Sequence, residues 1–152
     1  MPHDTLFRLM REAVRRVEET HQGAMLFSLS ALDHVAVPEA YDFKFNLSAK
    51  RVSINFQNGT WGPIVDQSGI LTGVAFNDLL RIEIDVVRAV ELIRKAGFKG
   101  PIFFCYLLQP VALQSPNPYY YFTPSSDPAA CGSLNANSYI RVDAVTGEVT
   151  IP

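Results

Sequence analysis

Two amphipathic segments constrain the fold of this chain most, because each is a helix pattern followed at once by strand patterns. Over residues 4–22, apolar side chains recur at helical spacing, opposite a face of arginine and glutamate. Asp4 is a suitable N-cap, and Gly23 is suited to end the helix in the left-handed conformation. Residues 77–96 predict a second helix that stops at Gly97. Its apolar arc is wider, so we expect it to lie deeper in the core.

Strand patterns follow each predicted helix. Residues 24–32 and 102–108 are short apolar runs bounded by turn formers, as is typical of central strands. Residues 41–47 and 51–57 alternate strictly between apolar and polar side chains, which predicts an antiparallel hairpin with one solvated face. Further strand patterns lie at residues 119–123, 139–142 and 149–151.

The two halves of the chain also resemble each other. Residues 65–72 match residues 142–150 when one inserted residue is allowed. Gly23 precedes the first of these segments by the same number of residues as Gly100 precedes the second. Self-similarity at a fixed spacing is the usual sign of duplication.

We therefore predict an α+β fold built from two helix-plus-antiparallel-sheet units. The units should span residues 4–73 and 77–152 and pack together as a single globular domain over residues 1–152. The second helix, with its wide apolar arc, is expected to join both units into one core.

The closing motif of the repeat resembles a known family. Residues 142–149, placed after a helix and antiparallel strands, look like the end of a PepSY-type domain, which has a cystatin-like arrangement of helix and curled sheet. Residues 62–69 also resemble a stretch of small bacterial immunity proteins with a PepSY-like fold. The resemblance implies a tandem pair of such units and an immunity-type or regulatory inhibitor role. Turn chemistry alone also explains the motif, since Asp143 can cap a turn and Gly147 can supply a positive φ.

Charge and composition argue against two classes of partner. Thirteen Lys and Arg stand against fifteen Asp and Glu, and no basic stripe is present, which disfavours nucleic-acid binding. No segment reaches about 18 apolar residues, and residues 1–10 lack a signal-peptide core, so we expect no membrane contact and a cytoplasmic location. Cys105 and Cys131 have no C-x-x-C spacing, which favours reduced thiols.

Motifs for the common catalytic chemistries are absent from the sequence. It contains neither a phosphate-binding loop, nor a dinucleotide-binding glycine pattern, nor a zinc-protease helix, nor a serine nucleophile elbow. The three histidines make no metal-binding spacing. We accordingly predict that the chain is not an enzyme and needs neither a cofactor nor a metal.

Three polar residues nevertheless define an alternative pocket between the helices and the sheet. His21 falls on the apolar side of the first helix, Glu83 among apolar positions of the second, and Cys105 on the adjoining strand. Such a pocket would make the chain a small-molecule-binding protein, or a small enzyme with Glu83 as acid or base and Cys105 as nucleophile. A packed helix-end histidine, a hydrogen-bonded glutamate and a buried thiol explain the same residues without function.

Aromatic residues carry the main functional prediction. Trp61 lies in a turn-rich segment, and Tyr119, Tyr120 and Tyr121 precede a long polar loop over residues 124–138. Aromatic anchors are frequent hot spots of protein binding, so we predict a non-catalytic module that binds a protein partner through these residues. The alternative is that the same aromatic rings cover the open end of the sheet. A homodimer that pairs through a sheet edge is a third hypothesis.

Overall fold

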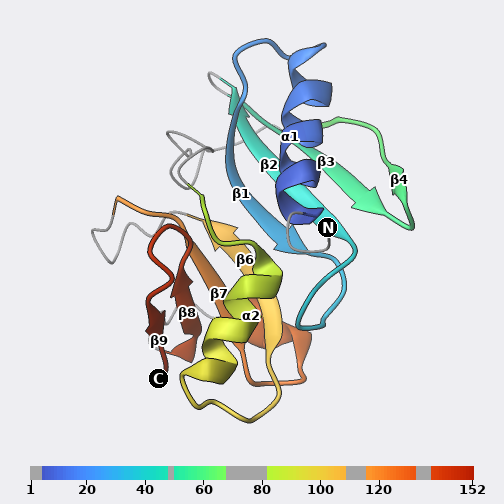
Figure 1. Cartoon of the computed structure of the whole chain (residues 1–152). Helices are drawn as coiled ribbons and strands as arrows, with labels where there is room; N and C mark the ends of the chain where they lie inside the picture. Colours follow the sequence, from blue (N-terminus) through green and yellow to red (C-terminus); the bar gives the residue numbers. More distant parts are fainter. Residues whose placement is uncertain (1–4, 48–49, 68–81, 109–115, 133–137) are drawn as a thin grey trace.

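The computed structural model describes residues 5–47, 50–67, 82–108, 116–132 and 138–152, drawn in colour in Figure 1. These residues form a nine-stranded antiparallel sheet in the order β4-β3-β2-β1-β6-β7-β8-β9, with β5 also pairing with β3. Two α-helices and a short 3-10 helix complete the described chain. The elements are α1 (Thr5–Glu18), β1 (Met25–Ala31), β2 (Tyr41–Leu47), β3 (Lys50–Gln57), β4 (Thr60–Trp61), β5 (Val65–Gln67), α2 (Val86–Lys95), β6 (Phe103–Leu108), β7 (Tyr119–Thr123), η3 (Pro128–Gly132), β8 (Ile140–Asp143) and β9 (Val149–Thr150).

The hairpin of β2 and β3 confirms the alternating pattern in the sequence. Phe43 and Phe45 are fully buried beneath α1, while Lys44 between them faces the other side of the sheet and is half-buried. The register runs from Tyr41 opposite Phe56 without a shift along the hairpin. Period-two alternation fixes this register, because a slip of one residue would turn every phenylalanine into solvent.

The predicted fold of two helix-plus-antiparallel-sheet units is wrong. One sheet runs through the described chain and dominates it, and the two helices are short by comparison. The strands assigned to separate units pair directly, with Leu29 of β1 opposite Leu107 of β6. Both leucines are fully buried. If β1 and β6 did not pair, the buried backbone N–H and C=O groups along these strands would lack hydrogen-bond partners. The cystatin-like, PepSY-like and internal-repeat description is therefore replaced by a single sheet. The predicted unit boundaries near residues 4, 73 and 77 lie outside the described residues.

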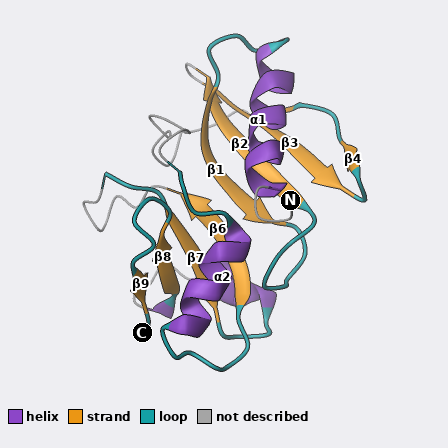
Figure 2. Cartoon of the chain, in the orientation of Figure 1, coloured by secondary structure: helices purple, strands orange, loops and turns teal. Residues whose placement is uncertain are grey.

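Both helices cover the same face of the sheet, as Figure 2 shows. The first helix is confirmed over Thr5–Glu18, and its apolar stripe of Leu6, Met10, Ala13 and Val17 is buried, but it ends four residues before the predicted end at residue 22. The predicted second helix is too long at its start, because α2 begins only at Val86. The part of the prediction before residue 82 lies outside the described residues.

A tertiary contact explains the late start of α2. The backbone N–H groups of Glu83 and Ile84 both donate to the carbonyl oxygen of Ala144, each at 3.0 Å. Asp85 follows with an extended backbone (φ −76°, ψ 162°) and stands at the N-cap position. These bonds tie the segment to the turn after β8, and the helix forms where they end.

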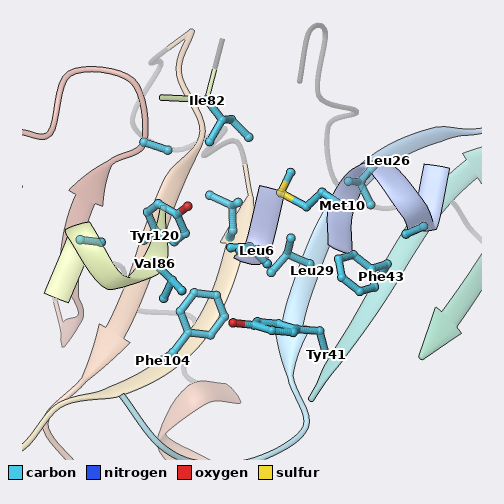
Figure 3. Close-up of a cluster of buried hydrophobic side chains, with 14 of the residues drawn as sticks. Leu6, Met10, Leu26, Leu29, Tyr41, Phe43, Ile82, Val86, Phe104 and Tyr120 are labelled. Atoms are coloured by element: carbon cyan, nitrogen blue, oxygen red, sulfur yellow. The ribbon is translucent and has the colours of Figure 1, made fainter. Parts of the chain in front are cut away.

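The core is continuous across the junction of β1 and β6. In Figure 3, Tyr41 of β2 reaches towards Phe104 of β6, and their ring centroids lie 6.1 Å apart in an edge-on arrangement. Phe104 in turn lies 6.0 Å from Tyr120 of β7. Leu6 of α1 and Val86 of α2 belong to the same buried cluster. Apolar contacts therefore unite the parts of the chain on either side of the junction.

The opposite face of the sheet carries a smaller cluster closed by a disulfide. Cys105 of β6 is bonded to Cys131 of η3, with Cα atoms 5.3 Å apart, so the prediction of reduced thiols is wrong. The hydroxyl of Tyr139 donates to the Cys131 carbonyl oxygen at 3.0 Å. Tyr106, Tyr121 and Tyr139 pack together there, with ring centroids 4.9 to 5.6 Å apart. The disulfide holds part of the long polar loop over this cluster; residues 133–137 of that loop are outside the described ones.

Candidate functional site

A groove lies between the N-terminal turns of α1 and α2 and the loop that joins β1 to β2. We call it the interhelix groove; its volume is about 740 Å³. That size falls within the range of about 300–1,000 Å³ typical of small-molecule sites. Its apolar lining comes from Leu6, Leu9, Val37, Pro38, Phe56, Val86 and Val87.

The loop that walls the groove is held in place by its own contacts. The Leu32 N–H donates to the Ala40 carbonyl oxygen at 3.0 Å, which closes the base of the loop. The Phe104 N–H donates to the Val35 carbonyl oxygen at 2.8 Å, which fixes the middle of the loop to β6. His34 stacks on Phe103, with ring centroids 4.4 Å apart. The wall is thus formed before any ligand arrives, which lowers the entropy cost of binding.

Two buried polar residues lie at the inner side of the groove. Tyr41 and Asp85 both line it, and they are only 1% and 3% exposed. Burial raises the pKa of the Tyr41 hydroxyl, and the negative charges of Asp85 and Asp33 raise it further. Tyr41 therefore stays neutral at physiological pH and keeps its O–H as a hydrogen-bond donor.

A hydrogen bond from the sheet holds the segment before α2. The hydroxyl of Tyr120 donates to the carbonyl oxygen of Ile84 at 2.5 Å, next to Asp85. Tyr120 is completely buried, and its pKa is raised well above the ordinary value, first by burial and then by the charge of Asp85. Because the hydroxyl stays protonated, this bond persists and positions Asp85 beside the groove.

Charged residues form the outer rim. The guanidinium groups of Arg15 and Arg16 bind Glu12 at 2.5 and 2.9 Å and hold its pKa down, at about 2. Glu12 is therefore ionised and already balanced by charges on its own helix. Arg8 and Glu39 are exposed on the two sides of the groove.

The structure does not bring His21, Glu83 and Cys105 together, although the sequence predicted one pocket for them. His21 lies three residues beyond the end of α1, and its Nε2 is 3.0 Å from Asp66 Oδ1. Glu83 is exposed and precedes α2, so its predicted position on a helical face is wrong. Cys105 is in the disulfide on the opposite face of the sheet.

The four aromatic residues predicted to bind a partner are placed very differently. Tyr120 is fully buried on the helix side, and Tyr121 is buried in the cluster on the other face, so neighbouring residues of β7 lie on opposite faces of the sheet. Tyr119 is half-buried beside that cluster. Trp61 is half-buried against Phe56, with ring centroids 4.9 Å apart and Arg16 above its ring. Trp61 and Tyr119 are thus the two of the four that reach the surface.

The segment at residues 142–149, which carried the family resemblance, forms a turn after β8. Asp143 Oδ1 accepts the N–H groups of Val145 and Thr146 at 2.8 and 3.0 Å, as predicted. Gly147 takes a positive φ of 82°. Although partial burial opposes the shift, hydrogen bonds from Asn117 and from the turn backbone hold the pKa of Asp143 below its usual range. This carboxylate therefore stabilises the turn and faces no groove.

Asp66, which the sequence match aligns with Asp143, has a different role. It is exposed, and its carboxylate contacts His21 and Lys50, the latter at 3.2 Å. Both hydrogen bonds lower the pKa of Asp66. The two matched segments therefore differ in the contacts of their aspartates.

Sequence reasoning missed the residues that form the interhelix groove. Val37 and Tyr41 were assigned to a loop and a strand without a site, and Asp85 to the middle of a helix. An apolar run inside the loop, residues 35–38, was a usable signal, because valines in an exposed loop call for an explanation. Nothing local in the sequence indicates that α1 and α2 begin side by side.

Two further features are absent from the described residues. These residues contain no cluster of three or more His, Cys, Asp or Glu side chains with the arrangement of a metal site. Neither described α-helix has the length and apolar character needed to cross a membrane.

Comparisons with known proteins add a fold but no family. No family model matches this chain, and no curated protein matches it. A crystal structure from Clostridium difficile 630, described as a "putative lipoprotein", is similar with a TM-score of 0.61 and 16% sequence identity. The similarity covers 93% of this chain and 89% of that one. At this identity it establishes a shared fold alone and does not bear on the PepSY resemblance.

Proposed function

We propose that the chain is a non-catalytic binding protein whose ligand, a small molecule with an apolar body, occupies the interhelix groove. The observation that carries this proposal is the groove itself: a volume of about 740 Å³, mainly aliphatic walls and a few buried polar groups on one side. Burial of apolar ligand surface supplies the affinity of such sites, and the polar groups set orientation.

The side chains of the groove support binding over catalysis. Among the described residues that line it, none is a cysteine, histidine, lysine or serine. Apart from the hydroxyl of Tyr41, the described lining contains one hydroxyl group, that of Thr5. The Thr5 hydroxyl oxygen accepts a hydrogen bond from Arg8 at 3.4 Å. A serine, cysteine or lysine nucleophile activated by an adjacent histidine therefore has no counterpart among the described residues that line the groove.

A neutral apolar probe tests the proposal. Titration of the isotope-labelled protein with n-octanol, followed by amide NMR shifts, should move the signals of Leu9, Val37 and Val87 together. Val37→Asp should weaken this binding about tenfold, because it places a charge on the apolar wall. Val65→Asp is the matched control, since Val65 is also an exposed valine (48%, against 40% for Val37) but lies on β5 and does not line the groove. Shifts elsewhere, or equal effects of both variants, would refute the groove as the site.

A second candidate function is contact with a protein partner, in the concrete form of an immunity-type or regulatory inhibitor. The observation that favours it is a cluster of exposed apolar side chains in one loop: Leu32, Val35 and Val37 are 43%, 41% and 40% exposed. Exposed apolar clusters are common at interaction sites. A photo-crosslinking residue at Val35 should capture a protein in cells of the source organism, whereas the same residue at Val65 should not. Equal yields from both positions would count against a docking role for the loop.

The Cys105–Cys131 disulfide supports a location in an oxidising compartment in place of the cytoplasm that the thiol pattern predicted. Alkylation of protein taken directly from cells, followed by mass spectrometry, measures the thiol state. Two blocked cysteines would indicate a reducing compartment, and two unreactive cysteines an oxidising one.

A further inference from the structure

We propose that the Cys105–Cys131 disulfide is a reversible redox site, which a dithiol reductant opens in the folded protein to release η3 from the sheet. The proposal goes beyond the proposed function, because the disulfide lies on the face of the sheet opposite the interhelix groove. When the bond is closed, η3 covers the cluster of Tyr106, Tyr121 and Tyr139. When the bond is open, that cluster becomes accessible.

A hollow beside η3 gives access to the disulfide. Both Cys105 and Cys131 line it, together with residues from the end of β1, the start of the β1–β2 loop and η3. Its volume is about 330 Å³, roughly ten times the share of one water molecule in the liquid, so a small thiol can enter it. Thiol–disulfide exchange depends on access of the attacking thiolate to a sulfur of the bond. The hollow therefore makes exchange possible without unfolding of the chain.

The two cysteines differ in exposure. Cys105 is buried on β6, in the cluster of tyrosines. Cys131 is half-buried on η3, a short helix whose residues Pro128, Ala129 and Gly132 are exposed. An incoming thiolate therefore reaches the Sγ atom of Cys131 more easily than that of Cys105.

The exchange has two steps. The thiolate of the reductant attacks Cys131 Sγ and forms a mixed disulfide, while the Cys105–Cys131 bond breaks and Cys105 leaves as a thiolate that takes up a proton. The second thiol of the reductant then attacks its own sulfur in the mixed disulfide, and Cys131 leaves as a thiol. Two electrons pass from the dithiol to the two cysteines, and the dithiol is oxidised to its own disulfide.

The remaining contacts of η3 with the sheet are weak. None of its five residues is buried. The hydroxyl of Tyr139 lies 3.0 Å from the Cys131 carbonyl oxygen and 3.4 Å from that of Ala130, and water can replace this hydrogen bond at the surface. The preceding loop is held independently, because His34 Nε2 donates to the Ser125 carbonyl oxygen at 2.9 Å. Opening of the disulfide should therefore release η3 locally and leave the loop attached at Ser125.

Release of η3 changes the surface of the protein. Tyr121 and Tyr139 are buried in the oxidised protein, and Cys131 packs against their cluster. Tyrosine rings, which combine apolar area with a polar hydroxyl, are frequent at interfaces between proteins. The redox state of one bond thus selects between a covered and an uncovered aromatic surface.

Reduction kinetics of the unmodified protein test the accessibility of the bond. Dithiothreitol is added in buffer and in concentrated urea, and the free thiols are alkylated and counted by mass spectrometry over time. We expect the rate in buffer to lie within about tenfold of the rate in urea, because the hollow admits the reagent. Alkylation during reaction with glutathione should locate the mixed disulfide on Cys131. Reduction in buffer that is no faster than global unfolding, or a mixed disulfide on Cys105, would overturn the inference.

Amide hydrogen exchange, measured by NMR, tests the release of η3. The N–H groups of Ala129 and Ala130 are bonded to Asp127, and reduction should speed their exchange about tenfold. The amides of Phe43 and Phe45, in the β2–β3 hairpin, should keep their protection. Unchanged exchange in η3, or equal loss of protection in the hairpin, would contradict a local latch.

Two variants separate the disulfide from the neighbouring hydrogen bond. The double variant Cys105→Ala/Cys131→Ala should show the fast exchange of η3 without reductant and no response to it. Tyr139→Phe is the matched control, because it removes the hydrogen bond to η3 but keeps the disulfide, so η3 should stay protected until reductant is added. Release of η3 in oxidised Tyr139→Phe would overturn the inference. If the double variant does not fold, the reduced unmodified protein decides the question, because it carries the same open bond.

Discussion

Replacement of both cysteines of the Cys105–Cys131 disulfide by alanine should lower the free energy of unfolding by about 3.5 kcal/mol. The two cysteines are 26 residues apart in the sequence. For a loop of that length, a cross-link lowers the conformational entropy of the unfolded chain by about 12 cal/mol/K. At about 25 °C that entropy corresponds to the stated free energy. For a chain of 152 residues, about 2–4 °C of melting temperature accompany each kcal/mol, so Tm should fall by roughly 7–14 °C.

Thermal and urea unfolding, followed by circular dichroism, measure this effect. Reduction of the unmodified protein should reproduce the fall in Tm, whereas the double alanine variant should not respond to reductant. The singly substituted chains are poor comparisons, because each keeps a free thiol. An unchanged Tm in the double variant would show that the bond does not tie η3 to β6, and the arrangement of that face of the sheet would have to be revised.

Three further predictions concern stability. Hydrogen bonds hold the folded-state pKa of Asp143 below its unfolded value. The ionised Asp143 side chain therefore stabilises the folded protein fully at pH values above the unfolded pKa, and this contribution is lost as pH falls through the folded pKa. Asp143→Asn should therefore flatten the fall in unfolding free energy below about pH 4, measured by urea unfolding across pH. Gly147→Ala should lower Tm with a cost of at least ~1 kcal/mol, because φ is 82° and the added Cβ would lie 3.2 Å from Leu92 Cδ1; an unchanged Tm would contradict that turn geometry. Tyr120→Phe removes the hydrogen bond to the Ile84 carbonyl and should cost about 1–3 kcal/mol in urea unfolding, and a neutral effect would argue against a buried, otherwise unsatisfied carbonyl there.

Local patterns predicted local structure well. The strict alternation of residues 41–47 and 51–57 gives the β2–β3 hairpin, and the stripe from Leu6 to Val17 gives α1, because each pattern depends on one element and one core. The turn at Asp143 was also predictable, since its hydrogen bonds join neighbours in the sequence.

Interactions between distant residues account for the wrong predictions. The start of α2 is set by hydrogen bonds from the N–H groups of Glu83 and Ile84 to the carbonyl oxygen of Ala144, a residue far along the chain. Helical periodicity in the sequence cannot predict such long-range hydrogen bonds. The pairing of β1 with β6 is equally non-local, and it turns two expected sheets into one. The cysteines illustrate the same limit, because only the stacking of η3 on β6 brings them to bonding distance.

The candidate site shows this limit most fully. Its walls come from α1, from residues 37–39 and from the start of α2, and none of these segments has a binding motif of its own. Conversely, Tyr120 and Tyr121 matched a general pattern for binding residues but serve the two cores. Burial on both faces of β7 could not be known before both helices and η3 were placed.

The most direct test of the proposed function is a map of intermolecular nuclear Overhauser effects between bound n-octanol and the methyl groups of the protein. The groove predicts contacts from the octyl chain to the methyls of Leu9, Val37 and Val87, which come from three separate segments. Such a set can arise only where α1, the β1–β2 loop and α2 meet. Contacts confined to Val65 or to other surface methyls, or an absence of contacts at saturating probe, would contradict the account.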